Sequence, residues 1–242
     1  MARTFDGVNQ YLMTTSPPIT VHPMTLTAWF NTTDITSYAN NIAALCKLTD
    51  ITTGAIHFLR TRGDVAGDPV SSQHDGSCTA YSSTGITSGQ WHHVLGAWYG
   101  NTNTYVYLDG GSLGTGYHGN PQAAADRFTI GAISWNNTVS NFFTGSIAEV
   151  AIYNTNIGAE AAATLGQGYS PLLVRPQDLV FYAPLVRHDN DIVGGITMTA
   201  YNSPTYSAHP PVLYATTPYQ VFLGTGGGAP AAVTRSYATI VG

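Results

Sequence analysis

Short segments rich in hydrophobic and β-branched residues recur along the chain, and clusters of Gly, Asn, Asp and Pro separate them. Segments of this length with turn residues between them are typical of strands in a β-sandwich or barrel. The predicted strands span residues 11–14, 25–32, 42–47, 55–60, 91–98, 104–108, 127–133, 146–153 and 178–185. The hydrophobic pattern therefore predicts an all-β fold.

Alternation within these segments indicates which side chains share a face of a strand. Residues 91–98 carry apolar side chains on both faces, as in a central strand of a sheet. His92 and His93 are neighbours there, so they point to opposite faces and cannot bind one metal ion together; we expect one at the core edge and one at the surface. Asp109-Gly110-Gly111 predicts a tight hairpin, because glycine readily adopts the positive φ that such turns need.

One short helix interrupts the strand pattern. Residues 158–165 are rich in alanine, and Gly166 and Gly168 are candidates for the C-terminal cap. We expect this helix to lie across the edge of the sandwich.

The C-terminal region has a different composition. From Ser203 the chain is rich in Pro, Thr, Tyr and Gly, and residues 224–230 have the composition of a flexible linker. Residues 236–241 have strand character, and a tethered strand can pair with a sheet edge of the same domain or of a neighbouring subunit. We therefore expect an extended arm over residues 203–242. Its candidate residues for anchoring or oligomer formation are Tyr237, Ile240 and Val241.

Charged residues are scarce. They make up 9% of the chain, against about 25% in an average soluble protein. The formal net charge is -5, and Lys47 is the only lysine, so no basic stripe can follow a phosphate backbone and we expect no nucleic-acid partner. No apolar run approaches the roughly 18 residues that cross a bilayer, and the first residues lack the apolar core of a signal peptide. We therefore expect neither a membrane anchor nor export by the general secretory route.

Cys46 and Cys78 are the only cysteines, too few for a disulfide framework. Free cysteine behaves as a small buried hydrophobe, so we interpret both as core thiols, with a bridge between them as the alternative. His74 precedes Cys78 by four residues, but no second pair of metal-binding residues stands nearby in the sequence. The spacing therefore predicts no zinc site.

A series of motifs runs in order over residues 3–168. They are Thr4-Phe5-Asp6-Gly7 with Tyr11-Leu12, Leu26-Thr27-Ala28-Trp29-Phe30, Trp91-His92-His93-Val94, Tyr105-Val106-Tyr107-Leu108-Asp109-Gly110, Phe128-Thr129-Ile130-Gly131 and residues 143–153. In this order they resemble the laminin-G-like jelly-roll family of the concanavalin A-like lectin and glucanase superfamily. The resemblance implies two curved antiparallel sheets. The fold that we predict is an all-β, two-sheet antiparallel jelly-roll sandwich with one short helix and an extended C-terminal arm.

Beyond these motifs, residues 179–185 and 191–195 resemble the segment that usually opens such a domain, although here they follow it. We therefore expect one permuted jelly roll over residues 1–202, in which residues 171–202 supply edge strands beside Phe5. This order resembles laminin-G-like proteins of tailed bacteriophages, where the domain decorates capsids, tails or fibres.

The superfamily includes glucanases, so paired catalytic carboxylates have to be considered. Retaining hydrolysis uses two carboxylates about 5–5.5 Å apart. The chain has two glutamates, Glu149 in a predicted strand and Glu160 in the predicted helix, and neither a paired-acid strand nor a serine-hydrolase or zinc-protease motif occurs. We therefore expect no enzyme activity. Domains of this family often hold calcium at the loop rim, but Asp6, Asp109 and Asp126 lie at predicted turns, where aspartate commonly bonds its own backbone. We therefore predict no cofactor, with a calcium ion at these turns as the alternative.

Glycan binding requires an aromatic platform beside hydrogen-bonding amides or carboxylates. Trp135, Asn136 and Asn137 in one predicted loop, and Tyr117 and His118 in another, offer this chemistry. The alternative for Trp135 is that it covers an edge of the core.

Three functional hypotheses follow from these features. The first is a non-enzymatic virion structural or surface-display protein, such as a capsid decoration or a fibre- or tail-associated module, that self-associates, contacts other virion proteins and binds glycans or a host surface. The second is a secreted or cell-surface carbohydrate-binding adhesion module, located outside the cell. The third is a degenerate glycanase.

Overall fold

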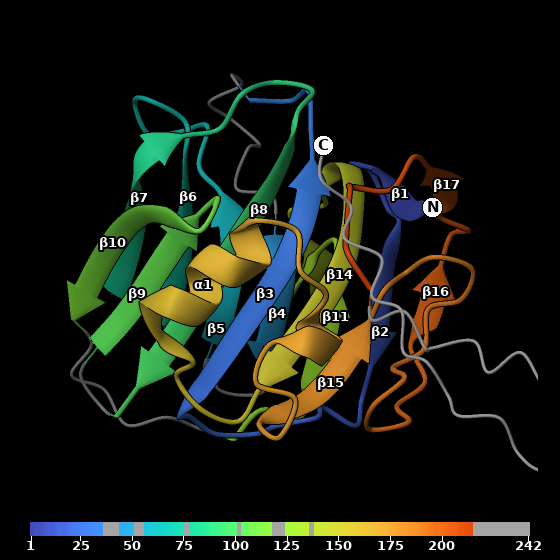
Figure 1. Ribbon diagram of the computed structural model, residues 1–242. Coiled ribbons are helices and arrows are strands. Elements are labelled where there is room, and N and C mark those ends of the chain that lie inside the picture. Colours follow the sequence, from blue (N-terminus) through green and yellow to red (C-terminus); the bar gives the residue numbers. More distant parts are fainter. Residues whose placement is uncertain are drawn as a thin grey trace, which may run out of the picture.

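Two antiparallel β-sheets lie face to face and form the predicted sandwich (Figure 1). The computed structural model describes residues 1–35, 44–50, 56–74, 78–100, 103–117, 124–135 and 138–214. Apolar side chains from both sheets fill the space between them. This core includes Leu26, Phe30, Leu59, Trp98 and Phe128.

The front sheet of Figure 1 has the strand order β10-β9-β8-β3-β14-β1-β17, and β15 also pairs with β14. Its strands are β1 (Ala2–Asp6), β3 (Met24–Asn31), β8 (Trp91–Tyr99), β9 (Asn103–Leu108), β10 (Gly111–Tyr117), β14 (Thr144–Tyr153), β15 (Leu179–Ala183) and β17 (Thr205–Ser207).

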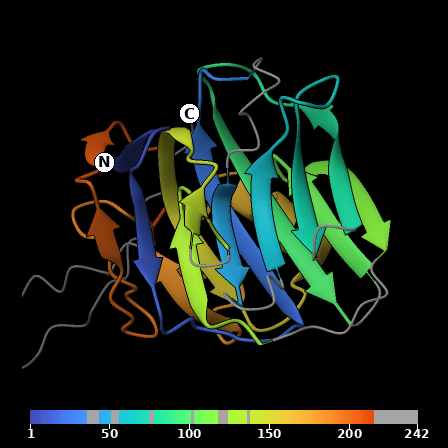
Figure 2. The same cartoon turned by 180° about the vertical axis from the view of Figure 1, so that it is seen from behind.

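The back sheet faces the viewer in Figure 2 and has the order β16-β2-β11-β4-β5-β6-β7. Its strands are β2 (Tyr11–Thr14), β4 (Ala44–Thr49), β5 (Ile56–Thr61), β6 (Pro69–His74), β7 (Cys78–Gly85), β11 (Arg127–Ile130) and β16 (Thr199–Tyr201). The remaining elements are a separate hairpin of β12 (Ile133–Trp135) and β13 (Thr138–Ser140), helix α1 (Gly158–Gly166) and the 3-10 helix η1 (Pro171–Leu173).

The nine ranges predicted as strands in the first part of the chain, residues 11–185, all overlap strands of the structure, whereas β1, β6, β7, β13, β16 and β17 were not predicted as strands. The strand expected at residues 236–241 lies outside the described residues. Strand β6 has the sequence PVSSQH, which lacks an alternating apolar pattern, yet it is buried along its whole length. It forms a strand because β5 and β7 supply backbone partners on both of its sides. The hydroxyl of Ser72 is satisfied by Thr104 at 2.8 Å and by the carbonyl of Tyr105 at 2.9 Å.

The predicted tight hairpin between β9 and β10 is confirmed. Leu108 pairs with Gly111, and the two turn residues Asp109 and Gly110 have φ angles of 52° and 74°. Helix α1 packs directly on this turn, because a Cβ atom at Gly110 would lie 2.8 Å from the Cα atom of Ala163. The turn therefore needs glycine both for its backbone angle and for the close approach of the helix.

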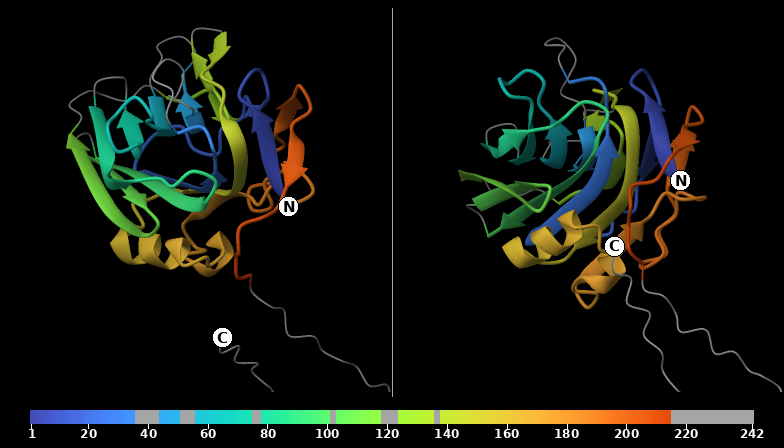
Figure 3. Two further views of the ribbon diagram at one scale, coloured as in Figure 1. Left: turned by 90° about the horizontal axis from the view of Figure 1, so that it is seen from above. Right: turned by 45° about the horizontal axis from the view of Figure 1, so that its top comes forward.

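Helix α1 covers the outer face of the front sheet instead of lying across an edge as expected (Figure 3). Ala162 and Leu165 pack in one apolar cluster with Leu95 of β8 and Tyr107 of β9. The expectation is wrong because the outer sides of β8 and β9 are themselves apolar, and covering them with the helix removes this apolar surface from water, which stabilises the fold. Gly168, one of the two predicted cap glycines, follows the helix with a φ of 91°.

His92 and His93 point to opposite faces of β8, as predicted, but neither is a surface residue. The Nε2 atom of His93 lies 2.6 Å from the hydroxyl of Thr27, and burial lowers the pKa of this imidazole to about 4. Burial also opposes the charged form of His92, but its hydrogen bond with Asp109 raises its pKa overall. His93 is not at the surface because the outer face beside it is covered. Its ring lies 5.4 Å from that of Trp29, and Val212, far along the chain, packs against the apolar cluster to which Trp29 belongs.

Residues after α1 add strands to both sheets. Strand β15 pairs with β14, β16 with β2, and β17 with β1 beside Phe5. Farther along, Tyr169 forms a parallel bridge with Leu213. Strand β17 lies beyond residue 202, so the sandwich that the structure describes includes Thr205–Ser207.

Candidate functional site

A shallow hollow opens where two loops meet at one end of the sandwich. Gly7 and Val8 from the β1–β2 loop line it on one side, and Ser140 at the end of β13 lines it on the other with the two residues that follow, Asn141 and Phe142. Asp6 builds the first loop, because its Oδ1 atom accepts the backbone N–H groups of Val8, Asn9 and Gln10 at 2.9, 3.1 and 3.2 Å. Burial alone would raise the pKa of Asp6, but these hydrogen bonds lower it overall, so the carboxylate stays ionised.

Aromatic rings stand beside the hollow. Tyr11 of β2 stacks on Tyr201 of β16 with ring centroids 4.4 Å apart and planes 4° from parallel. The ring of Phe142, which lines the hollow, lies 6.1 Å from that of Tyr11. The three rings are partly exposed and come from segments far apart in the sequence. They provide an apolar wall at the rim.

Amide side chains tie the same loops together. Gln10 donates from Nε2 to the carbonyls of Asn202 and Ser203 at 3.1 and 3.3 Å. In return, Asn202 donates from Nδ2 to the carbonyl of Asn9 at 2.7 Å. Aromatic rings and hydrogen-bonding amides are therefore held side by side at the ends of β2 and β16 and on the loops next to them.

Hairpin β12–β13 extends from the edge of this hollow. Ser140 lines the hollow and pairs with Ile133, whereas Trp135 pairs with Thr138 two residues farther along the hairpin. The ammonium of Lys47 on β4 donates to the carbonyl of Ser134 at 3.0 Å, which docks the hairpin on the back sheet. Burial and the nearby Arg60 lower the pKa of Lys47 to about 7.

The structure separates the two predicted groups of glycan-binding residues. Trp135 is 58% exposed, so it does not simply cover a core edge, and it belongs to the hairpin beside the hollow. Tyr117 is 70% exposed at the end of β10, and β9, β8, β3 and β14 lie between β10 and β1 in the front sheet. The other predicted residues lie outside the described residues, namely Asn136, Asn137 and His118 and the arm residues Tyr237, Ile240 and Val241.

Sequence reasoning missed Val8, Phe142 and Tyr201 as part of this site. Tyr11 was noted only as part of a family motif. Its aromatic character is visible in the sequence, but its partner Tyr201 is contributed by β16 through a pairing across the back sheet. No local pattern indicates that pairing.

The glutamates are arranged differently from a glycosidase pair. Glu149 is buried and accepts hydrogen bonds from the phenols of Tyr182 at 2.5 Å and Tyr214 at 2.6 Å. Burial and the Glu149 carboxylate raise the pKa of both tyrosines. Glu160 lies on the exposed side of α1. The contacts of Glu149 thus join β14 to Tyr182 of β15 and to Tyr214. A retaining glycosidase instead needs a second carboxylate opposite the first.

The remaining candidate groups have structural partners. Asp109 accepts the backbone N–H of His93 at 2.8 Å, and Asp126 contacts the guanidinium of Arg127 at 3.1 Å. Cys46 is buried in the core, and burial raises the pKa of its thiol, as expected for a core residue. Within the described residues, no helix has both the length and the apolar character to cross a membrane.

A two-sheet antiparallel sandwich with a hollow in its rim loops is the architecture of lectin-like jelly rolls. A laminin G family model, described as Concanavalin A-like lectin/glucanases superfamily, matches residues 6–163, and the chain belongs to this superfamily. The predicted resemblance is thereby confirmed at the level of the family and fold. A comparison with curated protein sequences finds no match.

Solved structures share the fold at low sequence identity. A protein from Bacteroides ovatus, solved under the description "putative carbohydrate binding protein", is 20% identical with a TM-score of 0.63, and the match covers 88% of this chain and 61% of that chain. A heptameric SAP-like pentraxin from Limulus polyphemus is 16% identical with a TM-score of 0.55, covering 81% and 94%. The CBM40 of a Ruminococcus gnavus IT-sialidase is 12% identical with a TM-score of 0.50, covering 69% and 98%.

Proposed function

We propose that this protein is a non-catalytic glycan-binding protein whose site is the rim hollow together with the β12–β13 hairpin. The observation that carries the proposal is the hollow lined by Val8, Asn141 and Phe142, with an exposed tryptophan on the adjoining hairpin. Binding sites for small ligands combine apolar walls with a few polar groups that fix orientation. A sugar ring has an apolar face and a ring of hydroxyls, so it matches this combination.

The two parts of the site suggest how a short oligosaccharide would bind. One sugar ring lies in the hollow against Phe142, with its hydroxyls toward Asn141 and the Asp6 loop. The next ring lies on Trp135, at the far end of the hairpin. The superfamily membership supports this class of ligand, as does the description of the Bacteroides ovatus protein of the same fold.

To test this, binding of the intact chain to a glycan array is followed by titration calorimetry of the strongest ligand. Trp135→Ala removes an exposed ring, and Val8→Asp places a charge at a lining position that is 68% exposed, so both variants should fold. Each is expected to weaken glycan binding by about 30-fold, the effect of losing a central aromatic or apolar contact.

Tyr99→Ala and Tyr117→Ala are the matched controls, because both tyrosines are exposed aromatic residues away from the hollow. They are expected to bind the ligand as the unmodified chain does. Loss of binding in the Tyr117 variant with none in the Trp135 and Val8 variants would place the site at the opposite sheet edge. A silent array would contradict glycan binding altogether.

The setting that we propose is surface display on a virion, with contacts to other virion proteins and to further copies of the chain. The support is compositional: with 9% charged residues, the polar surface repels neighbouring copies weakly. The alternative is a secreted or cell-surface adhesion module. Sedimentation of the chain with assembled particles would favour display on a virion, whereas glycan binding without any particle association would favour the adhesion module.

A further inference from the structure

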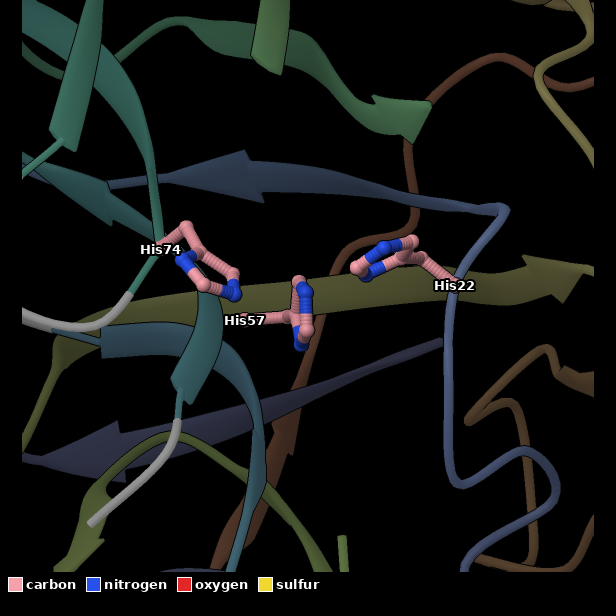
Figure 4. A group of neighbouring side chains, drawn as sticks. All are labelled: His22, His57 and His74. Carbon is pink, nitrogen blue, oxygen red and sulfur yellow. The ribbon is translucent and has the colours of Figure 1, made fainter. Parts of the chain in front are cut away.

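Three histidines from separate segments converge at one end of the sandwich. His57 of β5 and His74 of β6 are directly opposite each other in the strand register, so both project from the same face of the back sheet. His22 precedes β3 by two residues. Figure 4 shows the three rings directed toward one another, and one ligand nitrogen of each lies within 4.8 Å of the others.

The cluster faces the interior of the sandwich. His57 alternates with Phe58 along β5 and shares its face with Leu59, a residue of the core between the sheets. The indole of Trp98, on β8 of the front sheet, lies 5.1 Å from the His57 ring in an edge-on arrangement. His57 and His74 are 2% and 0% exposed, whereas His22 is half-buried. The cluster is therefore enclosed on the side of the sheets and reachable past His22.

Three imidazoles in one place form a ligand set for a particular class of metal ion. Imidazole nitrogen suits zinc and neighbouring divalent transition metals, whereas calcium and magnesium require oxygen ligands. In a tetrahedral site with Zn–N distances of about 2.0–2.1 Å, the ligand nitrogens lie about 3.3 Å apart. Small side-chain rotations, chiefly of His22 in its loop, would bring the three ligand nitrogens from their present separations of up to 4.8 Å to this distance.

We propose that His22, His57 and His74 bind one divalent transition-metal ion of the zinc type, with a fourth position left for water or an external ligand. The ion would join the loop before β3 of the front sheet to β5 and β6 of the back sheet. It would thus fasten the two sheets to each other at this end. The site is separate from the rim hollow and does not depend on the proposed glycan binding.

Sequence spacing does not indicate this site. In the sequence His74 stands four residues before Cys78, whereas in the structure it lies beside two histidines from other segments. A cross-strand pair and a loop residue leave no fixed interval in the sequence that a motif search could recognise.

The experiment uses the intact chain after chelator treatment and dialysis. Calorimetric titration with Zn²⁺ is expected to show one ion per chain, and saturating Zn²⁺ is expected to raise the midpoint of thermal unfolding by about 5–10 °C, because the ion binds the folded state. Ca²⁺ and Mg²⁺ are expected to do neither. Co²⁺ in place of Zn²⁺ is expected to give the intense visible absorption of a four-coordinate site.

His22→Gln is the decisive variant, because its side chain is half-buried and in a loop, so the sandwich should persist. Its affinity for Zn²⁺ should fall by more than about tenfold. His57→Gln and His74→Gln should behave alike, and His188→Gln, at an exposed histidine outside the cluster, should bind as the unmodified chain does. Unchanged Zn²⁺ binding in folded His22→Gln, or loss of binding in His188→Gln, would overturn the proposal, as would absence of Zn²⁺ binding by the unmodified chain.

Discussion

Gly114→Ala is expected to destabilise the protein by about 3 kcal/mol, at the upper end of the usual effect of overpacking. Gly114 lies in β10, where the front sheet meets β7 of the back sheet. A Cβ atom at this position would lie 1.7 Å from the carbonyl oxygen of Tyr81 and 2.4 Å from its carbonyl carbon. These atoms belong to the backbone, so no side-chain rotation relieves the overlap and one strand must move. Urea unfolding followed by circular dichroism measures the loss.

Gly111→Ala is the matched control in the same strand. A Cβ atom at Gly111 would meet nothing within 4 Å. Glycine and alanine differ there mainly in the unfolded chain, whose freedom alanine reduces, so we expect a change within about 0.5 kcal/mol or a small gain. Equal losses in the two variants would show that glycine is needed for the strand backbone itself, and that the contact between β10 and β7 is not the cause.

Local patterns in the sequence predict the parts of this fold that depend on neighbours along the chain. The hairpin at Asp109 and Gly110 could be predicted because the backbone angles of a two-residue turn are set by the turn residues themselves. The strand over residues 91–98 is visible for the same reason, since a short run of apolar residues between turn residues is a property of that segment alone.

Contacts between segments far apart in the chain determine the features of the fold that local sequence patterns do not indicate. Strand β6 is polar and becomes a strand through its two neighbours. Helix α1 is visible as a helix, but its position depends on the apolar outer face of β8 and β9. The candidate site is affected most: Trp135 could be identified from its type, whereas the stacking of Tyr11 on Tyr201 arises only when β2 and β16 pair. The hollow likewise arises only when the loop after β1 meets residues 140–142.

Glu149→Ala is expected to cost about 3 kcal/mol of stability, because it leaves two phenols without their carboxylate acceptor. Glu149 lies in β14 with a φ of 56°, at a point where the pairing register with β3 shifts, and this turns its carboxylate toward the C-terminal segment. Tyr182 is fully buried, so its hydroxyl cannot find water as a replacement. The Nε2 atom of His209 also lies 3.1 Å from the carboxylate, so the lost contacts link β14 to residues 209 and 214.

Two further variants separate the causes of this loss. Glu149→Gln keeps the size and one acceptor oxygen and should lose about 1–2 kcal/mol, whereas Tyr214→Phe removes one hydrogen bond from a partly exposed ring and should lose about 1 kcal/mol. Unfolding in urea gives the total loss. Hydrogen exchange gives its location, and amides of residues 205–213 should exchange faster in Glu149→Ala. If exchange there stays unchanged while global stability falls, Glu149 acts within β14 alone and does not hold the C-terminal segment on the sandwich.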